Sequence, residues 1–178
     1  MMGCFDMKKI RAVLFDRDGT LNVDTGYLHN ISEFQWMPDA PEALSWLNRQ
    51  NIKIYVITNQ SGIARGYFTF EDMNVLHEYM NDSLLVYGAQ IEKFYYCPHL
   101  PDGAVSDYAV DCTCRKPKPG LILRCLKENF LDADECIMIG DKPRDIECAE
   151  NAGVRGFLYD GGSLLKFVKE ILCTRISF

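Results

Sequence analysis

Short apolar segments, rich in β-branched residues, alternate along this chain with longer amphipathic segments. The apolar segments predict strands at 11–16, 52–59, 91–97, 135–141 and 155–161. The amphipathic segments predict helices at 41–51, 69–88, 119–130, 144–153 and 163–172. Strands joined through helices run parallel, and the helices then cover both faces of the sheet. We therefore expect an α/β fold, with a single domain over residues 1–178 and one parallel sheet.

Local signals sharpen some of these boundaries. Thr69 followed by Asp72 is the pattern of an N-terminal capping box, and Gly88 suits the other end of that helix. Pro119 is expected in the first turn of the helix at 119–130. Between the first two strands, the segment 21–51 is too short for a helix and a separate cap domain. We expect the segments 22–37, 61–68 and 97–114 to form the rim of any site instead.

Composition narrows the class of partner. The net charge of -6 over 178 residues opposes a broad nucleic-acid surface, although a local basic pocket for a small anion remains possible. The opening residues, MMGCFDMKKIRAVLFD, lack the apolar segment of a signal peptide, and no stretch approaches the length of a membrane helix. We expect a cytoplasmic monomer with reduced thiols, a small-molecule substrate, and neither nucleic acid nor membrane as partner.

Polar residues follow the predicted strands where open α/β sheets bind their ligands. A single aspartate at a strand end is more often a turn residue. Here, however, several strand ends carry polar residues whose chemistry fits one reaction. Two acids could share a Mg²⁺ ion, one could act as a nucleophile, and another could transfer protons. A hydroxyl and a lysine could hold phosphate oxygens, so the set predicts phosphoryl transfer. Its members are Asp16, Asp18, Thr58, Asn59, Gln60, Arg115, Lys116, Asp141 and Asp145.

Three of the eight cysteines and one of the three histidines lie close together in the chain. Cys97-x-His99 and Cys112-x-Cys114 form a Cys₃His set, which is typical of a closed, structural Zn²⁺ site. The alternatives are a chance cluster and a disulfide loop. The intervening segment 100–111 has little apolar content, so a metal would supply its order. The role of Cys4 stays open, and small buried apolar groups are expected at Cys125, Cys136, Cys148 and Cys173.

The motifs DRDGT, ITNQSG, RKPKPG and GDKPRD occur in this order between residues 13 and 145. Together they resemble the haloacid dehalogenase superfamily of phosphatases, which has a Rossmann-like fold. The resemblance implies a nucleophile at Asp16, an acid/base at Asp18, and an aspartyl-phosphate intermediate. It implies phosphate contacts from Thr58 and Lys116. The Mg²⁺ ligands that it implies are Asp16, Asp141 and the backbone carbonyl of Asp18, with Asp145 orienting Lys116 or a metal-bound water.

Longer stretches, DRDGTLNVDTGYLHN, ITNQSGIARG, YYCPHLPDG and CTCRKPKPG, resemble the bacterial heptose bisphosphate phosphatases over residues 10–160. The resemblance implies catalytic Mg²⁺, structural Zn²⁺, and removal of the 7-phosphate of D-glycero-D-manno-heptose 1,7-bisphosphate. That reaction is a step toward nucleotide-activated heptose for lipopolysaccharide and other surface polysaccharides. The substrate contacts that it implies are Asp24, Thr25, Gly26, Tyr27, Asn59, Gln60, Ser61, Arg65, Arg115 and Lys142.

Three rival functions remain. Histidinol-phosphate phosphatases share the acidic motif and both ends of the cysteine segment, but TNQSGIARG and the long segment between His99 and Cys112 favour the heptose enzymes. A nucleic-acid 3′-phosphatase would need a basic groove, which the acidic composition disfavours. A non-catalytic zinc-ordered module would keep its function without Asp16. We expect Trp36, Trp46, Tyr95 and Tyr96 to pack structurally, and His29 and His77 to lie at the surface or at caps.

Overall fold

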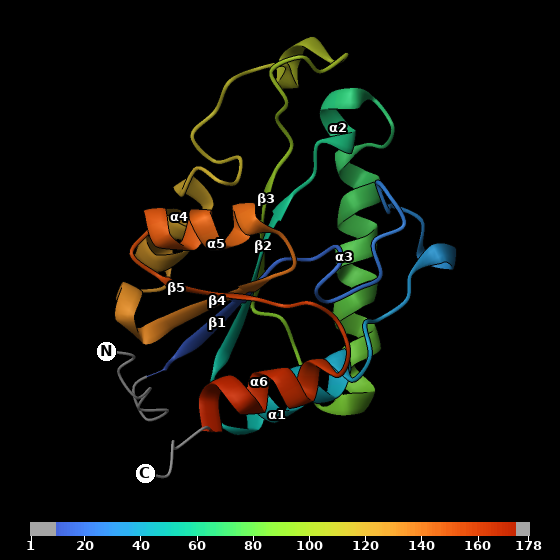
Figure 1. The fold of residues 1–178 in the computed structure, drawn as a ribbon. Coiled ribbons are helices and arrows are strands. Elements are labelled where there is room, and N and C mark those ends of the chain that lie inside the picture. Colours follow the sequence, from blue (N-terminus) through green and yellow to red (C-terminus); the bar gives the residue numbers. More distant parts are fainter. Residues whose placement is uncertain (1–9, 174–178) are drawn as a thin grey trace.

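The computed structural model describes residues 10–173, so that Cys4 lies outside the described residues. A single parallel sheet runs through its centre in the order β3-β2-β1-β4-β5 (Figure 1). All five predicted strands are confirmed, each somewhat shorter than predicted. Their bounds are β1 (Ala12–Phe15), β2 (Lys53–Asn59), β3 (Lys93–Cys97), β4 (Cys136–Gly140) and β5 (Arg155–Leu158).

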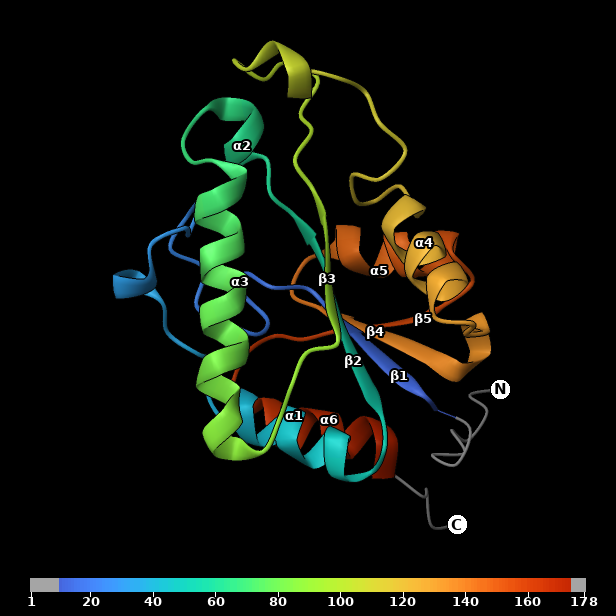
Figure 2. The same cartoon turned by 180° about the vertical axis from the view of Figure 1, so that it is seen from behind.

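Helices cover both faces of the sheet, as predicted. Figures 1 and 2 show α4 and α5 on one side, and α1, α3 and α6 on the other. The α-helices are α1 (Ala40–Arg49), α2 (Gly62–Arg65), α3 (Phe70–Leu84), α4 (Gly120–Glu128), α5 (Pro143–Asn151) and α6 (Leu164–Cys173). Short 3₁₀ helices lie at Ile31–Glu33, Leu85–Tyr87, Ser106–Tyr108 and Ala133–Glu135. No helix within residues 10–173 is long and apolar enough to cross a membrane.

The central strand shows why the apolar segments carry no polar alternation. Val13 and Phe15 pack into the cluster that includes α1 and α6, whereas Ala12 and Leu14 pack into the cluster that includes α4 and α5. All four side chains are fully buried, because a parallel strand between two helical layers has no solvated face. Because both faces of β1 are packed against apolar layers, the position of the residues that directly follow the strand is fixed as well.

The helix boundaries are mostly as predicted. Thr69 and Asp72 form the reciprocal capping box at the start of α3: the Asp72 N–H donates to the Thr69 hydroxyl at 3.1 Å, and the Thr69 N–H donates to the Asp72 carboxylate at 2.8 Å. The prediction for Pro119 is wrong. Its ψ of 1° places it outside the helix as the N-cap residue, and α4 begins at Gly120. The short helix α2 was not predicted, since four residues are too few to show a periodicity.

Two expectations about single side chains are also wrong. His77 is buried, because α3 presents it to Phe94 of β3, where the two rings stack at 4.1 Å. Cys173 is exposed, since it is the last described residue of α6 and lies beyond the apolar contacts of that helix. Packing roles are confirmed for Trp36 and Trp46, which lie partly buried against the core.

Candidate active site and metal cluster

The carboxyl ends of the three central strands bring the predicted catalytic residues together. Asp16 follows β1, Thr58 lies at the end of β2, and Asp141 follows β4. Since β1 pairs with both β2 and β4 in parallel, these ends lie side by side at one edge of the sheet. Carboxylate oxygens of Asp16, Asp141 and Asp145 all lie within 4.8 Å of one another.

Lys116 enters this acidic group from the loop before α4. Its ammonium Nζ lies 2.7 Å from Asp16 Oδ1 and 2.7 Å from Asp145 Oδ1, and it donates to the Ile57 carbonyl at 2.7 Å. The Asn59 side chain accepts from the Lys116 N–H at 3.0 Å and donates to the Lys116 carbonyl at 3.1 Å. The Lys116 side chain is fully buried, and its ammonium nitrogen lies 2.7 Å from each of these three oxygens. Lys116 is therefore fixed in place by the sheet rather than by its own loop.

Burial and neighbouring charges shift the pKa values of Asp16 and Lys116 in opposite directions. Burial raises the pKa of Asp16 to about 6, although the neighbouring Lys116 ammonium pulls that pKa down. Burial lowers the pKa of Lys116, but the carboxylates of Asp16 and Asp145 outweigh it and leave the pKa above its ordinary value. Lys116 consequently stays charged, and its positive charge is what makes a carboxylate at Asp16 tolerable in this position.

Asp18 is held by donors on three sides. The Arg17 guanidinium donates from Nε to Oδ1 at 3.2 Å and from Nη2 to Oδ2 at 3.0 Å. The Asn22 amide donates to Oδ1 at 3.0 Å, and the Gln60 amide donates to Oδ2 at 3.0 Å. The same Gln60 nitrogen donates to the Thr58 hydroxyl at 2.9 Å. These contacts give Asp18 one orientation and tie it to the predicted phosphate-binding hydroxyl.

The acidic group fits a hard divalent cation. Asp141 Oδ1 is buried and accepts no hydrogen bond within the described part of the chain, while Asp141 Oδ2 lies 2.6 Å from Lys142 Nζ. A buried carboxylate oxygen without a partner is costly, and a cation would supply that partner. Gly19, at φ +85°, leaves room for this carboxylate, because a Cβ there would clash with Asp141 Oδ2.

A pocket of about 350 Å³ opens beside Asp18. Eight of the ten predicted substrate contacts line it: Asp24, Gly26, Tyr27, Asn59, Gln60, Ser61, Arg65 and Arg115. Thr25 and Lys142 are not part of its lining, and Lys142 binds Asp141 instead. Arg144 lines the pocket although the sequence did not single it out; its position inside the motif GDKPRD was the available signal.

Three arginines give this pocket a positive wall, and two of them have defined supports. Arg65 lies with its guanidinium carbon 5.7 Å from the centre of the Tyr27 ring, and its buried Nε has no hydrogen-bond partner in the described residues. Tyr67 packs edge-on against Tyr27 at 4.9 Å. Arg115 donates to the His99 carbonyl at 3.3 Å. The wall is suited to an anionic group some distance from Asp16.

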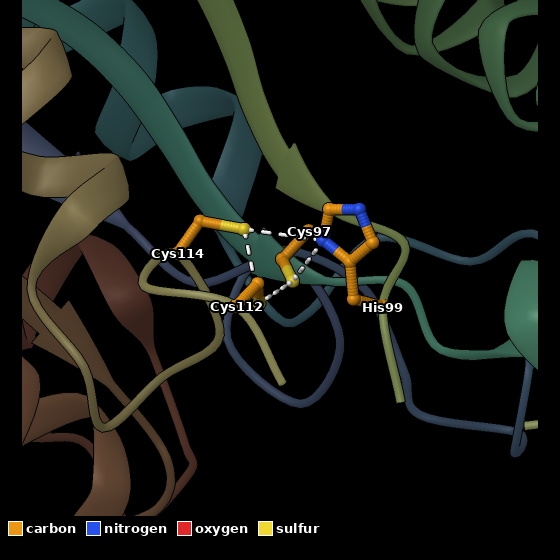
Figure 3. A group of neighbouring side chains, drawn as sticks. All are labelled: Cys97, His99, Cys112 and Cys114. Atoms are coloured by element: carbon orange, nitrogen blue, oxygen red, sulfur yellow. Dashed lines mark hydrogen bonds between the residues drawn. The ribbon is translucent and has the colours of Figure 1, made fainter. Parts of the chain in front are cut away.

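The predicted zinc ligands converge in space. Figure 3 shows the three sulfurs and the His99 Nδ1 facing one another at the end of β3. The Cys97–Cys112 and Cys112–Cys114 sulfurs lie 3.5 and 3.3 Å apart, and Nδ1 lies 3.6 and 3.4 Å from the sulfurs of Cys97 and Cys114. These separations are close to the edges of a tetrahedron around one ion with bonds of about 2.3 Å to sulfur. The cluster therefore could hold one metal ion, with no position left open.

Electrostatics within the cluster suit metal binding. Hydrogen bonding, first from Cys97, lowers the pKa of the Cys114 thiol to about 5. The same contact raises the pKa of Cys97, with burial adding to it. One thiolate is thus already favoured, and thiolates are the form that binds zinc.

Comparisons with known proteins agree with this geometry. The family Hydrolase_like, described as "HAD-hyrolase-like", matches residues 113–166. The "D-glycero-beta-D-manno-heptose-1,7-bisphosphate 7-phosphatase" of Pasteurella multocida is 44% identical over 149 residues, 84% of this chain and 79% of that protein. The protein of the same name from Rhodopseudomonas palustris is 39% identical over 161 residues, 90% of this chain and 89% of that protein.

The fold is also shared with a solved structure. The D,D-heptose 1,7-bisphosphate phosphatase of B. bronchiseptica, complexed with magnesium and phosphate, superimposes with a TM-score of 0.80. It is 26% identical, and the match covers 92% of this chain and 99% of that one. The fold, the cluster of acidic residues and the sequence similarity thus agree. The chain belongs to the D-glycero-beta-D-manno-heptose-1,7-bisphosphate 7-phosphatase family of haloacid dehalogenase-like hydrolases.

Proposed function

We propose that this protein is a Mg²⁺-dependent phosphatase that hydrolyses the 7-phosphate of D-glycero-β-D-manno-heptose 1,7-bisphosphate. One observation carries the chemistry: Asp16, Asp18 and Lys116 lie together at the carboxyl edge of the sheet, next to a pocket with three arginines. The names of the relatives support the substrate and its β-anomer. The reaction would serve the synthesis of activated heptose.

In the first step, a carboxylate oxygen of Asp16 attacks the phosphorus of the 7-phosphate, and the bond from phosphorus to the sugar oxygen breaks. Asp18, as the protonated acid, gives its proton to the leaving oxygen. Lys116 and the Thr58 hydroxyl bind the phosphoryl oxygens, on which negative charge is spread. The product of this step is an aspartyl-phosphate on Asp16.

In the second step, Asp18 is the base. Its carboxylate takes a proton from a water molecule, the water oxygen bonds to phosphorus, and the bond between phosphorus and Asp16 breaks. Inorganic phosphate leaves and both aspartates return to their starting forms. The hydrogen bonds from Arg17, Asn22 and Gln60 to Asp18 support this double role, because they hold its carboxyl group in one orientation.

Two metal ions belong to the proposal. Asp16, Asp141 and the backbone carbonyl of Asp18 would hold Mg²⁺, which when bound offsets the charge of the phosphoryl oxygens. Asp145 would act through Lys116, whose ammonium lies 2.7 Å from its carboxylate. Cys97, His99, Cys112 and Cys114 would hold Zn²⁺ in a structural role.

The positive wall favours a bisphosphate over histidinol phosphate. Arg65, Arg115 and Arg144 line the pocket that would receive the part of the substrate distal to the reacting phosphate. In the heptose substrate that part carries a second phosphate, which guanidinium groups bind well. Histidinol phosphate carries an ammonium group instead, and that group would face like charges here. The Arg65 Nε, which is buried and has no hydrogen-bond partner among residues 10–173, supports the same choice.

Turnover of both substrates decides the proposal. With Mg²⁺ present, kcat/KM should be more than tenfold higher for the heptose bisphosphate than for histidinol phosphate. A preference of that size for histidinol phosphate would overturn the substrate assignment. A nucleic-acid phosphatase would reveal itself through salt-dependent oligonucleotide binding.

A further inference from the structure

We propose that His77 is a positioning residue for catalysis: it holds the Arg17 guanidinium, and Arg17 in turn fixes the carboxyl group of Asp18. The inference rests on the proposed phosphatase chemistry, in which Asp18 transfers protons. Neither His77 nor Arg17 reaches the reacting atoms in this scheme. Their contribution is the orientation of a third side chain.

Arg17 is the link between the two. It lies between the two aspartates in the motif DRDGT, and its side chain is fully buried. Nε and Nη2 bind the two oxygens of Asp18 as a fork, and Nη2 also donates to the Leu28 carbonyl at 2.9 Å. The remaining terminal nitrogen, Nη1, lies 3.2 Å from Nε2 of His77. Each guanidinium nitrogen thus has a partner, which sets the plane of the fork.

His77 acts as a hydrogen-bond acceptor at this contact. A guanidinium group offers donors and no acceptor, so Nε2 of the imidazole accepts and the ring proton lies on Nδ1. Burial lowers the pKa of His77 well below its ordinary value, and the charge of Arg17 acts in the same direction. A neutral ring is what the contact requires.

The ring itself is held by the fold. His77 comes from α3, and its imidazole stacks on Phe94 of β3 with 4.1 Å between ring centres and 9° between ring planes. Tyr96 lies against the same ring at a centre distance of 6.2 Å. The helix and the edge strand therefore place the accepting nitrogen, and the proposed relay runs from the packing of α3 on β3 to Asp18.

Loss of the acceptor would disturb Asp18 without removing it. A buried guanidinium N–H without a partner is costly, and the guanidinium relieves that cost by turning toward another acceptor. Turning breaks the fork on Asp18, while Asn22 and Gln60 continue to hold the carboxylate. The carboxyl group of Asp18 would then be misplaced, and the loss of rate would be largest for a leaving group that needs a proton from Asp18.

Leaving-group dependence is the readout. Phenyl phosphate and p-nitrophenyl phosphate differ little in size, but p-nitrophenolate departs without protonation and phenolate does not. We would measure kcat/KM for both with Mg²⁺, because kcat/KM reports the step that breaks the bond to the leaving group. His77→Leu should lower kcat/KM for phenyl phosphate at least about tenfold more than for p-nitrophenyl phosphate. His77→Gln, whose side-chain oxygen can accept from Arg17, should restore the wild-type ratio.

A second histidine provides the matched control. His29 also stacks on a phenylalanine, Phe68, at 5.1 Å, but its Nδ1 lies 2.9 Å from the Tyr27 carbonyl. His29→Leu should therefore leave the ratio of the two kcat/KM values unchanged. If thermal unfolding shows that His77→Leu does not fold, His77→Phe keeps the stacked ring without the acceptor and is expected to shift the ratio equally.

Two results would overturn the inference: equal losses on both substrates, or a His77→Gln variant as impaired as His77→Leu. Both would mean that His77 supports the fold and not the orientation of Asp18. The aryl phosphates separate this outcome from the proposed function. A wild-type protein that cleaves them but not the heptose bisphosphate would refute only the substrate, and one that cleaves neither would refute the chemistry and the inference together.

Discussion

Replacing Cys112 by serine tests how the cluster of Cys97, His99, Cys112 and Cys114 is coupled to the active site. The two cations that follow the cluster, Arg115 and Lys116, are supported differently. Arg115 donates to the carbonyl of His99, itself a member of the cluster. Lys116 is held by Asp16, Asp145, the Ile57 carbonyl and Asn59, all of them outside the cluster. Cys112→Ser should therefore displace Arg115 and leave Lys116 in place.

The size of the effect follows from what Arg115 contributes. A hydrogen bond to a charged group is worth about 1.5–3 kcal/mol, and about 1.4 kcal/mol corresponds to a factor of ten. Losing the contact between Arg115 and the distal phosphate should raise KM about 10- to 100-fold. The kcat value should stay within about threefold, because the groups that stabilise the transferring phosphoryl remain buried in position.

The assay combines zinc content, thermal unfolding and steady-state kinetics on the heptose bisphosphate. Cys112→Ser should lose zinc and unfold at a lower temperature, whereas Cys173→Ser, at an exposed cysteine outside the cluster, should change neither. Arg115→Ala should reproduce the KM effect with zinc intact. Full zinc content and an unchanged KM in Cys112→Ser would refute the coupling, and a large fall in kcat would show that the cluster also positions Lys116.

Three further predictions concern the acidic group. Asp16→Asn should abolish turnover of both sugar and aryl phosphates, by at least about a thousandfold, with an unchanged circular dichroism spectrum; normal activity would return the chain to the class of non-catalytic modules. Gly19→Ala should raise the Mg²⁺ concentration for half-maximal activity, because its Cβ would clash with Asp141 Oδ2, whereas Gly88→Ala, at φ +62° with no described residue close to its Cβ, should not. In metal-free protein, burial raises the pKa of Asp16 from 3.8 to about 6, so the folded state binds the proton more tightly than the unfolded state. Its free energy of unfolding should fall as pH rises through that interval, measured by urea titration, and the fall should be smaller in Asp16→Asn; equal slopes would contradict the raised pKa.

Much of the site could be predicted because its parts are local in sequence. Asp16 and Asp18 follow a buried strand directly, and parallel strands bring their carboxyl ends to one edge, so the sequence sufficed to group them with Asp141. Cys97 and His99, like Cys112 and Cys114, are separated by one residue, and their chemistry indicates a shared ion. Their convergence in space is confirmed.

Other features could not be predicted from the sequence, because they depend on which faces of the helices and strands pack against one another. His77 has an ordinary place in an amphipathic helix, and its burial depends on the stacking of α3 against Phe94. Arg144 enters the pocket because α5 begins beside Asp141, which no periodicity reveals. Lys142 and Thr25 were expected at the substrate, but they are absent from the lining of that pocket.

By itself, the sequence determined the order of strands and helices along the chain, the acids at the strand ends and the four side chains of the cysteine and histidine cluster. These follow from periodicity and short spacing, which act within a few residues of the chain. The tertiary structure decided which oxygen and nitrogen atoms meet across distant segments. Lys116 meets Asp16, whose position in the chain is one hundred residues earlier, and it also meets Asp145; Arg17 meets His77 sixty residues away. Such contacts depend on how the helices pack on the sheet, because only packing brings segments that far apart in the chain within hydrogen-bonding distance.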